Sequence, residues 1–196
     1  MFRVITDEIR RTIFLEGASD ASCAQKIFVL CFAYGLHALI VYRLGDAIRK
    51  NLSKWWLLPA YYPGILAWRC LDSLVKRMYG IHIDPSASIG EGFYIGHFGG
   101  ISIGWCEIGN NCSVHQMVTI GSLSGVVEEY SDKTIVGDGV WIGGHSTISK
   151  GVTIGEGATI VVGSFVCADV KACAMVMGWP ARVIKNDFDN ASLMGH

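Results

Sequence analysis

The sequence predicts a mainly β fold, a parallel β-helix of hexapeptide repeats that follows an α-helical segment. Two observations lead to this fold class. Isoleucine or valine recurs at every sixth position through the second half of the 196 residues, and leucine gives way to glycine near Gly80. Eleven leucines lie in residues 1–80 and one lies in 81–192, whereas glycines number 5 up to residue 80 and 19 after it. Because leucine favours helices and branched residues favour strands, the secondary structure should change there.

The first 80 residues carry the pattern of three or four short helices. Basic residues interrupt the apolar stretches 27–42 and 55–69, and Pro59 and Pro63 should bend or end a helix in the second stretch. We expect helices over residues 4–15, 24–50, 54–59 and 63–79. Their apolar side chains could be buried in a subunit interface. Alternatively, the Trp-Trp-Leu-Leu run at 55–58 and its basic neighbours could make a peripheral membrane contact at a lipid surface.

The composition limits the classes of function. Hydrophobic residues make up 51% of the chain and charged residues 17%, so we expect a subunit interface or a membrane surface to cover part of the apolar surface. A net charge of −1 gives no general attraction for nucleic acid. Seven cysteines without a CxxC pair indicate neither a disulfide framework nor a metal site, and they fit a reduced cytoplasmic compartment. The charged N-terminus lacks the apolar core of a signal peptide.

The second half repeats with a period of six residues. This period fits neither an α-helix, with about 3.6 residues per turn, nor a plain strand, which alternates every two. It fits a short strand, a corner and the next strand, so that three sides make a coil of about eighteen residues and coils stack into a solenoid. Small residues and glycines beside the repeat suit the cramped corners. The expected inward positions are Ile83, Ile89, Ile95, Ile101, Ile108, Val114, Ile120, Val136, Ile142, Ile148, Ile154, Ile160 and Val166.

Four segments resemble a known family over about residues 35–187. They are IGEGFYIGHFGGISIG (89–104), CSVHQMVTIGS (112–122), VGDGVWIGGHSTISKGVTIGEGATI (136–160) and MGWPARVIK (177–185). Together they resemble the hexapeptide-repeat acyltransferases, in particular the serine acetyltransferase branch, which includes acetyltransferases of colanic acid and capsule biosynthesis. The resemblance implies a left-handed β-helix and a homotrimer with acetyl-CoA in the groove between neighbouring subunits. It leaves open whether trimers pair through their helical halves.

His97 is the candidate catalytic base. It lies two positions after the inward Ile95, so its side chain should point outward, and the glycines that follow leave an open surface. A neutral imidazole can take a proton from a hydroxyl group near neutral pH, which is the role that the resemblance implies. His115, directly after inward Val114, could face the same groove and help position the acceptor, or it could be a solvated corner residue. His145 lies in a corner-like GGHS segment and is expected to be structural.

The donor site is inferred from small residues and the C-terminal motif. The resemblance implies that glycines let pantetheine approach the backbone and that the GxPA element and its basic neighbours meet CoA. No metal is required for the direct transfer of an acyl group. The candidate donor-site residues are Gly143, Gly144, Gly163, Gly178, Trp179, Pro180, Arg182 and Lys185.

We divide the chain into three parts. Residues 1–80 form the helical region, residues 81–174 the β-helix domain and residues 175–196 the C-terminal element and tail. An excursion at 121–135 breaks the repeat, and it either reaches a neighbouring subunit's site or is a solvent loop. Its charged residues are Glu128, Glu129, Asp132 and Lys133.

The acceptor is inferred from departures from the family pattern. The family's serine enzymes have an aspartate fifteen residues before the base, where this chain has His82, and a histidine after the loop, near Lys133 here. These departures, with the apolar and basic helical half, favour a sugar hydroxyl of a bacterial surface polysaccharide or its precursor. The alternative is serine O-acetylation for cysteine biosynthesis. A non-catalytic β-helix scaffold is a further alternative, and it predicts no binding of acetyl-CoA.

Overall fold

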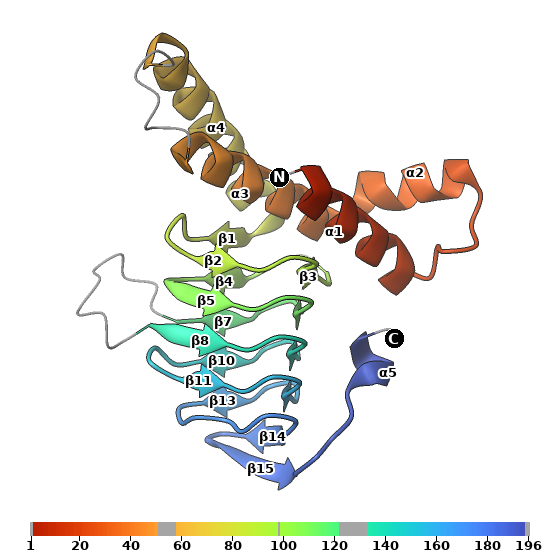
Figure 1. Ribbon diagram of the computed structural model, residues 1–196, viewed down its shortest axis with the longest axis vertical. Helices are drawn as coiled ribbons and strands as arrows, with labels where there is room; N and C mark the ends of the chain where they lie inside the picture. Colours follow the sequence, from red (N-terminus) through yellow and green to blue (C-terminus); the bar gives the residue numbers. More distant parts are fainter. Residues whose placement is uncertain (1, 51–57, 98, 122–132, 195–196) are drawn as a thin grey trace.

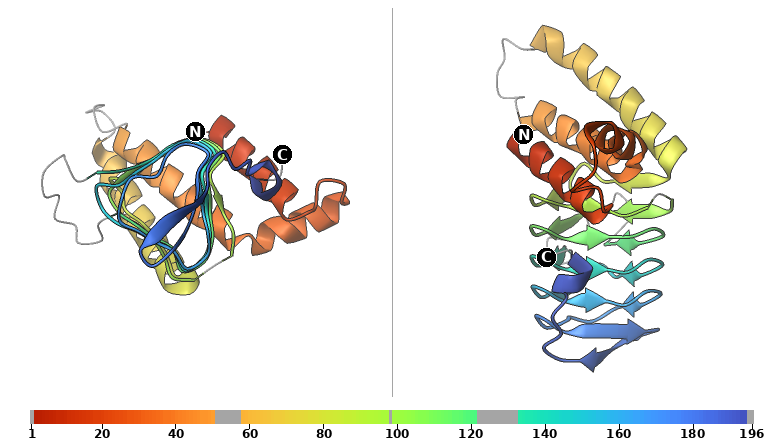
Figure 2. Two further views of the ribbon diagram at one scale, coloured as in Figure 1. Left: turned by 90° about the horizontal axis from the view of Figure 1, so that it is seen from below. Right: turned by 90° about the vertical axis from the view of Figure 1, so that its right-hand side faces the viewer.

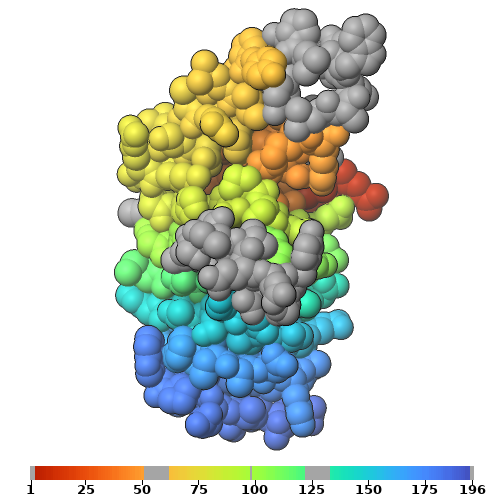
Figure 3. All heavy atoms as spheres, turned by 90° about the vertical axis from the view of Figure 1, so that its left-hand side faces the viewer, coloured from red at the N-terminus to blue at the C-terminus, as the bar shows by residue number. Residues whose placement is uncertain are grey.

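The computed structural model describes residues 2–50, 58–97, 99–121 and 133–194 of the chain. Four helices stand on one end of a column of stacked β-coils, and a short fifth helix lies next to the coils, below the end of the first helix (Figure 1). Viewed along the column, the coils superimpose as a triangle (Figure 2). A space-filling view shows the same order as bands of colour, from the helices down to the last coil (Figure 3). The helices are α1 (Phe2–Leu15), α2 (Cys23–Phe32), α3 (Tyr34–Lys50), α4 (Leu58–Tyr79) and α5 (Ala191–Met194).

The expected single helix over 24–50 is wrong, because the chain breaks at Ala33 and α2 meets α3 at 71°. The bend lets α3 pack closely on the first coil. Gly35 of α3 lies so near this coil that a Cβ atom added to it would be 2.3 Å from the Ile95 carbonyl oxygen, which leaves no room for a side chain. Helix α2, in contrast, has no buried residue. Among the described residues no single helix is long and apolar enough to cross a membrane, whereas α2 and α3 together pass that test as a bent pair.

Helix α4 also differs from the expected pattern. It begins at Leu58 and contains Pro63 in its second turn, so the helix expected to start at residue 63 begins earlier. Most of the helix expected over 54–59, and the run at 55–58 except its last residue, lie outside the described residues. Helix α4 ends at Tyr79, and the first strand starts at Ile81.

Short parallel strands form the three sides of the column. The sheets have the orders β1-β4-β7-β10-β13, β11-β8-β5-β2 and β15-β14-β12-β9-β6-β3. Among the described strands only β14 and β15 pair antiparallel, as a closing hairpin. The strands are β1 (Ile81–Ile83), β2 (Ser88–Ile89), β3 (Tyr94–Ile95), β4 (Ile101–Ile103), β5 (Cys106–Ile108), β6 (Ser113–Val114), β7 (Thr119–Ile120), β8 (Thr134–Val136), β9 (Trp141–Ile142), β10 (Thr147–Ile148), β11 (Thr153–Ile154), β12 (Thr159–Ile160), β13 (Phe165–Val166), β14 (Met175–Gly178) and β15 (Ala181–Lys185).

The inward rows predicted from the six-residue period are confirmed. All thirteen isoleucines and valines are buried, with exposed fractions between 0% and 7%. Stacked branched side chains fill the interior, and each fully buried one contributes about 1.5–3 kcal/mol of apolar transfer free energy. Parallel pairs such as Trp141 with Thr159 and Thr147 with Phe165 hold the coils eighteen residues apart.

One detail of the repeat differs from the prediction, at the corner that follows β3. Ile103, not Ile101, pairs with Ile120 of the next coil, although both isoleucines are buried. Ile95 and Ile103 are therefore eight positions apart, whereas Val114 and Ile120, their partners in the next coil, are six positions apart. The first corner of this edge is two residues longer than the one below it, and it carries His97.

A buried ion pair joins the helices to the first coil. The Arg43 guanidinium lies 2.7 Å from Oε1 of Glu8, whose side chain is fully buried. Arg43 also donates hydrogen bonds to the carbonyls of Ile89 and Gly90, at 2.7 and 2.5 Å. Because Arg43 binds α1 and the backbone of the β-helix together, it fixes where α1 lies over the coils.

Candidate active site

His97 lies on the enlarged corner after β3. Its side chain is exposed, as predicted, and its backbone adopts φ 64°, a left-handed conformation that few residues other than glycine adopt. The longer corner provides this conformation, and neighbouring Gly99 and Gly100 also have positive φ. The sequence therefore builds an outward turn at the one corner that carries the candidate base.

His115 lies beneath His97, between two glycines of the same row. The ring centroids of the two histidines are 6.2 Å apart, so the structure brings the two candidate catalytic residues together. A Cβ added to Gly96 would lie 2.9 Å from Nδ1 of His115, and the absence of a side chain there makes room for the ring. On its other side the His115 ring packs against Trp141, at 5.0 Å between centroids.

Burial keeps His115 neutral. Burial first, and the positive charge of a protonated His97 second, lower the pKa of the His115 imidazole below its ordinary value. Its Nε2 atom is buried and has no hydrogen-bond partner among the described residues. His115 nevertheless lines the pocket beside His97, so its neutral ring forms part of the wall that a substrate would meet.

A pocket with a volume of about 250 Å³ opens at the two histidines. Leu15 and Glu16 come from the end of the first helical segment, 82 and 81 positions before His97, and Leu193 comes from α5. The β-helix, the N-terminal helix and the C-terminal tail therefore all contribute to it. Its lining residues are Leu15, Glu16, Tyr94, His97, Ser113, His115, Trp141 and Leu193.

Sequence reasoning missed part of this lining. Tyr94, Ser113 and Trp141 form one row across β3, β6 and β9, so a correct register would have aligned them beside the histidines. Glu16 and Leu193 carry no such signal. They lie in the pocket because α1 and the C-terminal tail pack against the coils. Arg11 of α1 connects these parts, since it donates to Oγ of Ser113 at 3.0 Å and contacts the buried Met194 sulfur.

The predicted donor residues follow one edge of the column away from His97. Gly143 and Gly144 lie one coil below His115, and the amide of Gly163 donates to the Gly144 carbonyl from the coil below that, at 2.9 Å. A Cβ on Gly143 would lie 2.7 Å from the backbone nitrogen of Val162, so the glycine permits close stacking. Coils are about 4.8 Å apart, so this edge extends about 19 Å from His97 to Trp179.

The closing hairpin ends that edge. Trp179 is 72% exposed and stacks on Phe165, at 4.8 Å between ring centroids. Gly178 ends β14, Pro180 is in the turn, and Arg182 and Lys185 are exposed on β15. The placement of these residues fits an elongated donor, while their individual contacts stay predictions.

The residues at positions where this chain departs from the family pattern either lie away from this edge or already have hydrogen-bond or ion-pair partners. His82 is exposed on β1, and partial burial first and Lys76 second lower the pKa of its imidazole. Asp84, the nearest acid, accepts hydrogen bonds from the amide and hydroxyl of Ser86, at 2.7 and 2.5 Å. Lys133 forms an ion pair with Glu107 at 2.9 Å. Glu107 is on β5, which belongs to a different sheet from the strands β3, β6 and β9 that line the pocket. Glu128, Glu129 and Asp132 lie outside the described residues.

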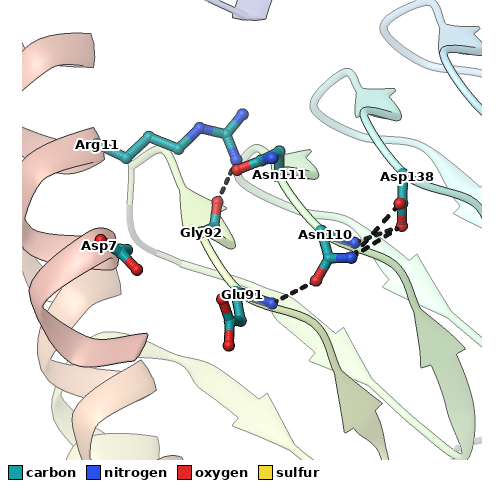
Figure 4. A pocket seen from close by; sticks show the side chains of 7 residues that line it. All are labelled: Asp7, Arg11, Glu91, Gly92, Asn110, Asn111 and Asp138. Carbon is teal, nitrogen blue, oxygen red and sulfur yellow. Dashed lines mark hydrogen bonds between the residues drawn. The ribbon is translucent and has the colours of Figure 1, made fainter. Parts of the chain in front are cut away.

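A second pocket, of about 650 Å³, separates α1 from the corners of the upper coils (Figure 4). Its amides form a ladder, in which Asn110 Oδ1 accepts from the amide of Glu91 at 2.9 Å and Asp138 Oδ1 accepts from the amide of Asn110 at 2.7 Å. Arg11 reaches across to the Gly92 carbonyl. These bonds tie coils to one another and to α1. Within the described part of the chain no group of three His, Cys, Asp or Glu side chains could hold a metal ion.

Comparisons with known proteins identify relatives of the chain. A serine acetyltransferase of Bacillus subtilis (strain 168) is 34% identical over 185 residues, which cover 93% of this chain and 77% of that protein. One of Bacillus licheniformis is 34% identical over 170 residues, covering 84% of this chain and 71% of the relative. No protein-family model matches the chain.

Solved structures share the fold. The soybean serine acetyltransferase complexed with serine superposes with a TM-score of 0.72 at 27% identity, covering 93% of this chain and 68% of that one. The Brucella abortus serine acetyltransferase in complex with coenzyme A gives a TM-score of 0.72 at 23% identity, covering 94% and 67%, and shows the fold alone. The match confirms the left-handed parallel β-helix with N-terminal helices.

The serine acetyltransferase relatives and the solved β-helix structures together define an acyltransferase of the β-helix class. The chain belongs to the serine acetyltransferase-like branch of the hexapeptide-repeat acyltransferases.

Proposed function

We propose that the protein transfers the acetyl group of acetyl-CoA to the hydroxyl of L-serine, with His97 as general base. The observation that carries the proposal is the exposed His97 imidazole over the neutral His115, in a pocket of about 250 Å³ at the end of a glycine-lined edge. The relatives named serine acetyltransferase, and a neighbour solved with serine, support this acceptor.

The proposed reaction is a direct transfer. The serine hydroxyl oxygen attacks the thioester carbonyl, and its proton moves to His97. The new O–C bond forms, the C–S bond breaks, and CoA leaves as a thiolate that takes up a proton. His97 supplies the base and the pocket supplies proximity, which together account for most of the catalysis that such a transfer needs.

Acetyl-CoA is the proposed donor and lies along the edge from Trp179 to His97. Support comes from the row of glycines, the exposed Trp179 ring, and basic Arg182 and Lys185 at the hairpin. A β-helix neighbour solved with coenzyme A is consistent with it. Guanidinium and ammonium groups bind phosphates by charge-assisted hydrogen bonds.

A sugar hydroxyl is the second candidate acceptor, which the sequence had favoured over serine. The comparisons support serine better, because the relatives carry that name. Two observations favour a sugar. Tyr94 and Trp141 place aromatic rings in the pocket wall, where they could pack on the apolar face of a sugar ring. His82 also stands where the serine enzymes have an aspartate.

The proposal includes a homotrimer in the cytoplasm. Exposed apolar side chains support an interface between copies, among them Phe28 (64% exposed), Leu66 (64%) and Val162 (58%). Sedimentation of the purified protein tests the trimer. A predominant monomer at micromolar concentration would contradict it.

An acceptor screen tests the function. Release of CoA from acetyl-CoA is measured with L-serine and with a panel of nucleotide-activated sugars, against a blank without acceptor. We expect L-serine to give saturable turnover and the sugars to match the blank. Turnover with a sugar and none with serine would replace the first candidate with the second, and no binding of acetyl-CoA by calorimetry would reject both.

A further inference from the structure

Glu16 is the one carboxylate among the described residues that line the pocket of His97. It follows α1 directly, its side chain is exposed, and its Oε1 accepts a hydrogen bond from the Tyr94 hydroxyl at 2.9 Å. Burial first, and the neighbouring Glu16 carboxylate second, raise the pKa of Tyr94, so that its phenol stays protonated and donates. Tyr94 therefore fixes the direction of the Glu16 carboxylate beside the two histidines.

Glu16 lies apart from the basic side chains. The last turn of α1 holds no basic residue, and no Lys or Arg is among the described residues that line the pocket. Within the described part of the chain, no ion pair includes Glu16. A carboxylate at the C-terminal end of a helix also faces the negative end of the helix dipole, where a cation would be favoured. The guanidinium of Arg11 donates to Ser113 and to backbone carbonyls and not to Glu16. Glu16 therefore has no ion-pair partner among the described residues.

We propose that Glu16, oriented by Tyr94, is the specificity residue that binds the ammonium group of the acceptor. This inference rests on the proposed function and assigns the acceptor to compounds that carry both a hydroxyl and an ammonium group, such as L-serine. Oε1 is engaged by the phenol, and a carboxylate has acceptor capacity on its second oxygen for an ammonium N–H. With the ammonium on Glu16, the acceptor is oriented inside the same small pocket as His97.

The role differs from a purely structural one. Glu16 also connects α1 to β3 through Tyr94, and the loss of that connection would change stability whatever the acceptor. Glu16→Gln separates the two roles, because an amide oxygen still accepts from the phenol while the negative charge is lost. Glu156, an exposed acid on a lower coil outside this pocket, provides the matched control Glu156→Gln.

The test measures steady-state KM and kcat of the full-length wild type, Glu16→Gln, Glu16→Asp and Glu156→Gln. With L-serine we expect Glu16→Gln to raise KM by about 10- to 100-fold, the worth of a hydrogen bond to a charged group. The KM for acetyl-CoA should stay unchanged, and Glu16→Asp should recover part of the loss. With 3-hydroxypropionate, which lacks the ammonium group, wild type and Glu16→Gln should have the same KM.

The outcomes separate the two proposals. An unchanged KM for L-serine in Glu16→Gln, with a working wild type, would overturn the inference and leave the proposed function intact. An equal rise in KM with 3-hydroxypropionate would also overturn it, because the loss would then not depend on the ammonium. A wild type that does not acetylate L-serine but acetylates a neutral sugar would reject the serine function and this inference together.

Discussion

The imidazole rings of His97 and His115 lie 6.2 Å apart, one coil above the other, at the open edge of the β-helix. His97 is exposed, whereas His115 is half-buried against Trp141. Burial lowers the pKa of the His115 imidazole, whereas the His97 ring is open to solvent. Two residues of the same type therefore differ in their environment through burial.

The fit between Gly96 and His115 gives the first prediction. A Cβ at position 96 would lie 2.9 Å from Nδ1 of His115, so Gly96→Ala should displace the ring. We expect kcat to fall by about 10- to 100-fold, the cost of misplacing a catalytic group by roughly 1 Å, with little change in acetyl-CoA affinity. Gly64→Ala is the control, since an added Cβ in α4 meets nothing within 4 Å. Equal kcat values for the two variants would contradict the prediction.

The neutral state of His115 predicts a dependence of stability on pH. Its pKa is lower in the folded state than in the unfolded state, so the unfolded state binds a proton first. The stability of the fold with a neutral His115 is fully present above the pKa of the unfolded state, about 6.5. The free energy of unfolding decreases as the pH falls through that value, because the unfolded state then gains a proton that the folded state does not. Denaturant unfolding of wild type and His115→Gln at pH 7.5 and 5.5 measures it. We expect the free energy of unfolding to decrease less between pH 7.5 and 5.5 in the variant than in the wild type. Equal decreases would show that His115 is not the cause.

The Glu8–Arg43 ion pair predicts a large loss of stability on removal of one partner. Burial raises the pKa of Glu8, and the Arg43 charge and hydrogen bonds oppose that shift. Arg43→Met should lower the free energy of unfolding by about 3–5 kcal/mol, because it leaves a buried carboxylate unpaired. The double variant Glu8→Leu/Arg43→Met should recover part of this loss. No recovery would mean that the bonds of Arg43 to the Ile89 and Gly90 carbonyls dominate.

The fold was largely predictable because a β-helix repeats one local rule. A row of stacked isoleucines needs the same residue type at the same place in each coil, and this requirement produces the six-residue period of the sequence. The position of His97 outside the core followed from the same rule. The register at the enlarged corner did not follow, because Ile101 and Ile103 are both buried and the pairing of one of them with Ile120 depends on the next coil.

The helical half and the pocket were less predictable, because they depend on contacts between distant segments. The break at Ala33 lies inside a continuous apolar run, and it arises because α3 and not α2 packs on the first coil. Glu16 reaches Tyr94 across 78 positions of sequence. A sequence period cannot predict a contact between two segments this far apart, so the placement of Glu16 beside Tyr94 required the structure.

The exposed Trp179 predicts a loss of donor affinity. Its ring stacks on Phe165 at the end of the glycine-lined edge and leaves most of its surface free. Trp179→Ala should raise the KM for acetyl-CoA several-fold with little change in kcat or melting temperature. Ile135→Ala, an exposed residue of another sheet, is the control. Equal KM values for acetyl-CoA in both variants would exclude Trp179 from the donor site.

The turnover of His97→Ala tests the central claim most directly. Because His97 is exposed, the variant should fold and bind acetyl-CoA with wild-type affinity by calorimetry. A positioned general base contributes about 10²- to 10⁴-fold, so kcat for acetyl transfer should fall by that factor. A kcat within a few-fold of the wild type, in a folded variant that binds acetyl-CoA, would contradict the assignment of His97 as the catalytic base.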